Sequence, residues 1–260
     1  TYDALVTVRT GDISNTGGNL IIATDTNGSG SGTLNLRGGL DALTYGGNIT
    51  LGGGDTSASG YAIGENDEGW NEGVRIDNVV NLQSSGGNII IRGKTSTRSV
   101  STSGYGNAGF GIYYINSNGT IDSGSGTISI SGINQNTSSA TTYSAGVLVA
   151  LNSTKTITIT SSNTTNSAIQ IVGSATGSSS SVNGMELEEN SPLIIAATGS
   201  GGGVSLSLDG VGYDLIQRAG GYLYLLANGG DIDFSGADAS VTDWYKASDA
   251  YIGSKAASLV

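Results

Sequence analysis

The stretch Gly86-Gly87-Asn88-Ile89-Ile90-Ile91-Arg92-Gly93 decides the fold of this protein. Glycine opens and closes it, and an asparagine and three isoleucines lie between. Glycine and asparagine favour turns, whereas β-branched residues favour strands, so the stretch predicts a short strand between two turns. The same phrase returns at residues 17–22, 46–52 and 126–132, and in looser form at residues 168–171, 203–208 and 230–236.

The phrase recurs with a period that is typical of repeat proteins. Between successive copies the steps are 29, 40, 39, 41, 37 and 26 residues. These steps join the anchors Leu20, Ile49, Ile89, Ile128, Ile169, Leu206 and Ile232. A period of roughly 20–50 residues is the signature of solenoids and related architectures. The chain has 44 glycines among its 260 residues. Because they recur at the ends of the repeated strands, they do not indicate a low-complexity sequence.

Each repeat carries two further strands. A second phrase, glycine followed by apolar residues, begins at Gly73, Gly111, Gly146 and Gly184. Weaker strands are expected at residues 79–82, 120–122, 156–160 and 193–195. Apolar and polar residues alternate in these strands, which places the apolar side chains on one side. Loops rich in Ser, Thr, Gly and Asn fall in one phase, which predicts a fringe on one side of the coil, at residues 53–72, 94–110, 133–145 and 174–183.

These features predict an all-β fold, a single right-handed parallel β-helix of about seven coils with polar lateral loops. Right-handed crossovers between parallel strands are strongly favoured. One core ladder is expected to join Leu51, Ile91, Ile130, Ile171, Leu208 and Phe234, and a second Val74, Ile112, Val147 and Met185. This β-helix is expected to span residues 1–236. Residues 237–260 are expected to form an irregular segment, either a further coil or a packing segment, within a longer chain or an assembly.

The composition excludes several functions. The chain has no histidine and no cysteine, which rules out Ser-His-Asp and Cys-His catalysis, histidine-ligated zinc and disulfides. Its formal net charge of −11 argues against a nucleic-acid partner, because nucleic-acid binding needs a basic surface. No apolar run reaches the roughly 18 residues of a membrane span. We therefore expect a protein that stacks and makes contacts, without a reaction centre.

The glycine phrases resemble the repeats of a known family. The phrases Gly46-Gly47-Asn48-Ile49-Thr50-Leu51, Gly86-Gly87-Asn88-Ile89-Ile90-Ile91 and Gly126-Thr127-Ile128-Ser129-Ile130 are similar to those of filamentous-haemagglutinin-like exoproteins of the two-partner-secretion type. Those proteins are large bacterial surface adhesins that fold as right-handed parallel β-helices. Similar phrases also occur in autotransporter passengers, surface-layer proteins and phage tail spikes. The resemblance implies a secreted or cell-surface bacterial segment.

The acidic loop at residues 65–72 is the candidate metal site. It holds Glu65, Asp67, Glu68 and Glu72, and Ca²⁺ takes six to eight oxygen ligands. The spacing matches neither an EF-hand nor a Gly-Gly-x-Gly-x-Asp repeat, and a solvated loop is the alternative interpretation. Calcium is the one cofactor that the sequence indicates.

Aromatic residues near the loops form the candidate contact surface. Aromatic side chains supply stacking and contact area to glycans and to partner proteins. The alternative is that they cover the rod where the loops fold back. The residues concerned are Trp70, Tyr105, Phe110, Tyr113 and Tyr143.

Three function hypotheses follow. The first is a structural or adhesive shaft segment, not an enzyme, that stacks end to end and contacts itself, other surface proteins or glycans. The second is a carbohydrate-active β-helix enzyme or tail-spike depolymerase, because Asp231 and Asp233 share one face of a strand as paired carboxylates do in glycosidases. The third is a glycan- or protein-binding module using the loop aromatics. Glu186 points outward, and a solvated position is expected for it.

Overall fold

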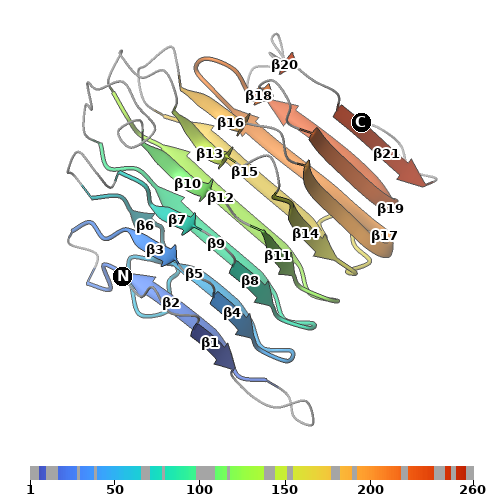
Figure 1. Cartoon of the computed structure of the whole chain (residues 1–260), viewed down its shortest axis with the longest axis horizontal. Helices are drawn as coiled ribbons and strands as arrows, with labels where there is room; N and C mark the ends of the chain where they lie inside the picture. Colours follow the sequence, from blue (N-terminus) through green and yellow to red (C-terminus); the bar gives the residue numbers. More distant parts are fainter. Residues whose placement is uncertain are drawn as a thin grey trace.

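The computed structural model shows a chain built of parallel strands (Figure 1). It describes residues 6–9, 17–27, 30–37, 40–65, 71–77, 80–97, 109–115, 118–137, 144–150, 155–176, 182–188, 192–217, 222–236, 244–246 and 250–255. Within these ranges the chain forms 21 strands and no helix, and every pairing between strands is parallel. The prediction of an all-β parallel solenoid is confirmed.

The strands lie on three faces, which the chain visits in turn. The first face is made of the glycine-phrase strands β2 (Leu20–Thr24), β5 (Ile49–Gly53), β9 (Ile89–Lys94), β12 (Ile128–Asn134) and β15 (Ile169–Ala175), and of the second halves of β17 (Pro192–Asp209) and β19 (Tyr222–Gly236). The two-residue strand β6 (Ala62–Ile63) pairs with the end of β9.

The other two faces follow the same order. The second face contains β3 (Leu34–Arg37), β7 (Val74–Asp77), β10 (Phe110–Ile115), β13 (Ala145–Ala150), β16 (Asn183–Glu188), β18 (Leu215–Gln217) and β20 (Trp244–Lys246). The third face contains β1 (Val6–Arg9), β4 (Leu40–Leu43), β8 (Val80–Gln83), β11 (Gly119–Asp122), β14 (Ile157–Ser161), the first halves of β17 and β19, and β21 (Ala250–Lys255). β20 thus extends the second face, and β21 the third face, beyond residue 236.

Among the described residues the second face has seven strands, the first face has seven strand segments besides β6, and the third face has eight strand segments. The second phrase supplies four strands of the second face, β7, β10, β13 and β16. The right-handed sense of the coil stays a prediction.

Side-chain ladders run along the interior. The ladder from Val74 through Ile112 and Val147 to Met185 is confirmed by the strand register. The ladder from Leu51 is correct as far as Ile171, but its next member is Leu206, and Leu208 lies opposite Gly173. The predicted equivalence of the anchors Ile169 and Leu206 is wrong in the same way, because Ile169 pairs with Val204. A slip of two residues keeps the same side chains inside, so alternation alone does not detect it.

Glycine forms the corner between the first and second faces. A Cβ atom on Gly132 would overlap the carbonyl oxygen of Gly146, where the two main chains touch. Gly93 meets Gly111 in the same way one turn earlier, and Gly173 meets Gly184 one turn later. The glycines that end the first phrase and begin the second are therefore required by the close approach of two backbones.

The second face is buried on both of its sides. All six residues of β13 are buried, although inward and outward residues alternate in it. Outward-facing Tyr113, Leu148 and Glu186 are 1%, 0% and 0% exposed. The expectation that Glu186 is solvated is therefore wrong: its Oε2 accepts a hydrogen bond from Nδ2 of Asn183 at 3.2 Å.

Candidate functional site

A group of charged side chains lies on the outer side of the second face, around Arg75. The guanidinium of Arg75 is 3.4 Å from Oε1 of Glu72 and 3.4 Å from Oδ2 of Asp77. It also lies 5.3 Å from the ring centroid of Tyr113 on the neighbouring strand, within reach of a cation–π interaction. Both carboxylates are buried, so solvent ions screen these pairs only weakly. We call Glu72, Arg75, Asp77 and Tyr113 the Arg75 cluster.

Two of the five predicted contact aromatics belong to the packing around this cluster. The rings of Phe110 and Tyr113 are 4.8 Å apart and tilted by 33°. They form a small apolar cluster with Ala145, Leu148 and Ala150 on the outer side of the second face. Phe110 is 0% exposed, so neither ring is part of the protein surface. Trp70, Tyr105 and Tyr143 lie outside the described residues.

The structure describes only the two ends of the acidic loop. Glu65 is exposed, and its main-chain N–H donates to Oγ1 of Thr33 at 3.3 Å. Glu72 is 1% exposed and faces Arg75, which neutralises it. Asp67 and Glu68 lie outside the described residues, and the described ones contain no group of three acidic side chains that could hold a metal ion. The calcium site stays a prediction.

Buried hydrogen bonds of polar side chains connect the ends of the inserted loops to the strands of the solenoid. Asn134 is fully buried, and its Nδ2 donates to the carbonyl oxygen of Gly109 at 2.7 Å and to Oγ of Ser144 at 2.6 Å. Oδ1 of Asn71 accepts from the N–H of Ser96 at 2.9 Å and from its hydroxyl at 2.7 Å. Sequence reasoning missed these residues because Asn and Ser are common throughout the chain. The only signal was their position at the start or the end of an insertion.

Asp231 and Asp233 point outward from the second half of β19, as predicted. Oδ2 of Asp231 accepts a hydrogen bond from Nδ2 of Asn166 at 2.9 Å. The main-chain N–H of Asp231 donates back to Oδ1 of Asn166 at 3.3 Å. This reciprocal pair ties one turn to another, which is a structural role. Asp233 is exposed and lies beside Ser205 in the register.

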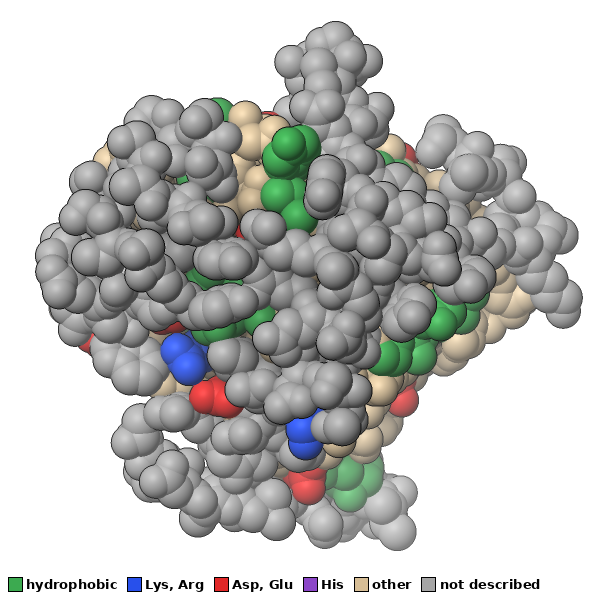
Figure 2. Space-filling model, turned by 45° about the horizontal axis from the view of Figure 1, so that its top comes forward, with side chains coloured by type: hydrophobic (Ala, Val, Ile, Leu, Met, Phe, Trp, Pro, Cys, Tyr) green, Lys and Arg blue, Asp and Glu red, His purple; other side chains and the backbone are tan. Residues whose placement is uncertain are grey.

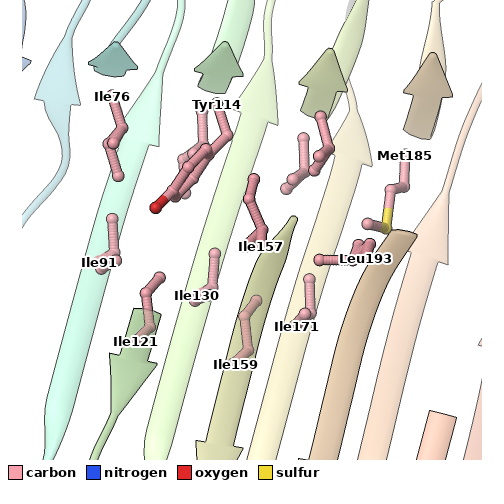
Figure 3. Close-up of a pocket in the computed structure, with 13 residues that line it drawn as sticks. Ile76, Ile91, Tyr114, Ile121, Ile130, Ile157, Ile159, Ile171, Met185 and Leu193 are labelled. Carbon is pink, nitrogen blue, oxygen red and sulfur yellow. The ribbon is translucent and has the colours of Figure 1, made fainter. Parts of the chain in front are cut away.

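The core contains a void of about 20 Å³ between the three faces (Figure 3). Tyr114, Ile91, Ile130 and Ile157 are among the side chains that point into it. A space of this size could hold one water molecule, but a water also needs two to four polar partners, and the lining is apolar. The void is a packing defect beside the Tyr114 ring, with no means of binding a polar ligand.

Among the described residues visible in Figure 2, the charged side chains form no extended patch of one sign. There, basic side chains of the described residues lie near acidic ones, and the apolar side chains form separate small areas. No helix of the described residues could cross a bilayer. Comparison with family models, with curated proteins and with solved structures finds no match to this chain. Fold and site together define a parallel β-solenoid with a buried outer layer on one face.

Proposed function

We propose that this chain is a structural segment of a secreted or cell-surface bacterial protein, a right-handed β-solenoid shaft of the filamentous-haemagglutinin-like type. The observation that carries the proposal is the continuous parallel register, which links β2 to β19 on the first face through every intervening strand. In such a stack each turn contacts its neighbours, and stability adds up along the axis. A stiff rod that presents lateral loops suits an adhesive shaft.

End-to-end stacking of copies is the second part of the proposal. Among the described strands, β2 pairs only with β5, and residues 232–236 of β19 pair only with β17. Unpaired strand edges are templates for pairing with another chain. The inward residues match, because Leu20 and Ile22 of one copy would continue the ladders that end at Ile232 and Phe234 of the next. Such contacts are head to tail and produce an open filament.

The third face sets a condition on this stacking. β1 and β21 both lie on the third face, and β21 follows the second half of β19 along the chain. When β2 of one copy pairs with the second half of β19 of another copy, β1 of the first copy would have to lie beside the first half of that β19. This place is already filled by β21 of the other copy. One of these two strands must leave its sheet, and association that needs a conformational change is slow.

We expect a register-specific cross-link between two cysteine variants. Ile21 and Asp233 occupy one outward column of the first face, through Thr50, Ile90, Ser129, Gln170 and Ser205. Neighbouring parallel strands are about 4.8 Å apart, within the range for a disulfide. The chain has no cysteine of its own. Mixing the Ile21→Cys and Asp233→Cys chains under mild oxidation should therefore give a covalent heterodimer, seen on a non-reducing gel.

The matched control is Gln170→Cys, an exposed position in the same column but within the stack. Mixed with the Ile21→Cys chain, it should give only the background of collisional cross-links. Head-to-tail stacking would be refuted if the Ile21→Cys and Asp233→Cys pair gave no more heterodimer than this control. The shaft hypothesis would then be tested separately, by locating the protein at the cell surface.

A further inference from the structure

The chain makes an irregular corner at Asn228 and Gly229, between the two halves of β19. Gly202 of β17 lies opposite both residues, so β19 carries an extra residue at this point, although β17 has the longer path between the pairs Ala197–Ala227 and Val204–Ile232. Gly229 is exposed and has a φ of +87°. An extra residue of this kind interrupts the hydrogen-bond ladder locally. The corner therefore combines an Asn-Gly bond, solvent access and an interrupted ladder.

We propose that the Asn228-Gly229 bond is a site of spontaneous deamidation through a succinimide. In that reaction the main-chain nitrogen of the following residue attacks Cγ of asparagine. Glycine favours the attack because it has no side chain to hinder it and reaches conformations closed to other residues. Asn228 is only half-buried, and its Nδ2 donates one hydrogen bond, to the carbonyl oxygen of Thr198 at 2.8 Å.

The reaction begins at the main-chain nitrogen of Gly229. The Gly229 nitrogen loses its proton and bonds to Cγ of Asn228, the bond from Cγ to Nδ2 breaks, and ammonia leaves with that proton. Water then opens the ring at either carbonyl, which gives aspartate or isoaspartate at position 228. Aspartate loses the donor to Thr198. Isoaspartate also inserts one methylene into the main chain, which displaces the corner relative to Gly201 and Gly202.

Two other Asn-Gly bonds of the described residues lack this combination. At Asn118, the N–H of Gly119 donates to the carbonyl oxygen of Thr156 at 3.3 Å, while Oδ1 accepts the N–H of Thr156 at 2.9 Å. At Asn183, the asparagine is 2% exposed, and the N–H of Gly184 donates to the carbonyl oxygen of Tyr213 at 2.9 Å. In both, the attacking nitrogen is held in a hydrogen bond to the next turn. Of these three sites we therefore expect position 228 to react first.

The test is peptide mapping by mass spectrometry of the full chain after incubation at mildly alkaline pH. In the folded protein, deamidation at Asn228 should exceed that at Asn118 and Asn183 several-fold, with isoaspartate as the major product. In concentrated urea the three sites should react at similar rates, because each is followed by glycine. Asn228→Gln should remove the fast component and leave the circular dichroism spectrum unchanged.

Three outcomes would overturn the proposal. One is equal rates at the three sites in the folded protein, and another is a preference for position 228 that persists in urea. The third is fast deamidation in the peptide that contains residue 228 when it survives in Asn228→Gln. Selectivity that appears only in the folded chain would attribute the reaction to the corner and not to the local sequence.

Discussion

Replacing Gly132 with alanine is expected to destabilise the protein by about 3 kcal/mol or more, at the upper end of what overpacking costs. The new Cβ would overlap the carbonyl oxygen and carbon of Gly146. These are main-chain atoms within a paired strand, so they cannot turn aside as a flexible side chain would. For a chain of this size the melting temperature should fall by about 6–12 °C in a calorimetric scan.

Ser129→Ala is the control for this prediction. Ser129 lies on the same strand, β12, and its side chain is outward and half-exposed. Its replacement should change the melting temperature by little, since surface substitutions usually cost within about 0.5 kcal/mol. A Gly132→Ala chain as stable as the Ser129→Ala chain would mean that the first and second faces do not meet as closely as described.

Removing the charge of Arg75 is expected to have the second large effect. In Arg75→Met the apolar length of the side chain is roughly kept, but Glu72 and Asp77 remain buried without their cation. Breaking a buried ion pair from one side costs about 3–5 kcal/mol, because the remaining charge stays desolvated. We expect about 3 kcal/mol, measured by urea unfolding, since the Arg75 side chain is 15% exposed.

The control is a double-mutant cycle with Glu72→Gln. If Arg75 neutralises Glu72, the cost of Arg75→Met should be smaller in the Glu72→Gln background, by about 1 kcal/mol or more. Additive costs would show that the two side chains do not interact.

Strand positions were predictable because the local signals agree with one another. The phrase around Ile89 combines turn residues, β-branched residues and a fixed spacing, and its register with Ile49 and Ile128 is as expected. The second-face ladder through Val74 and Ile112 was also predictable, since one glycine precedes each strand. The predicted register was wrong after the irregular corner between Ala197 and Val204. The chain can slip there by two residues without exposing an apolar side chain, so the sequence pattern does not detect the slip.

The candidate site was predictable only in part. That Glu72, Phe110 and Tyr113 lie near the loops follows from their position in the repeat. Their burial does not, because alternation describes a sheet with one buried side. The outward side of the second face is covered as well, and what covers a face is decided by contacts between distant segments. The pairing of Arg75 with Glu72 and Asp77 depends on that burial.

The measurement that tests the central claim most directly is electron microscopy of the purified chain over a range of concentrations. We expect single rods at low concentration and unbranched filaments, one solenoid wide, that lengthen as the concentration rises. Because a strand must be exchanged at each junction, the filaments should grow slowly. Single rods of constant length at every concentration, after long incubation, would contradict end-to-end stacking.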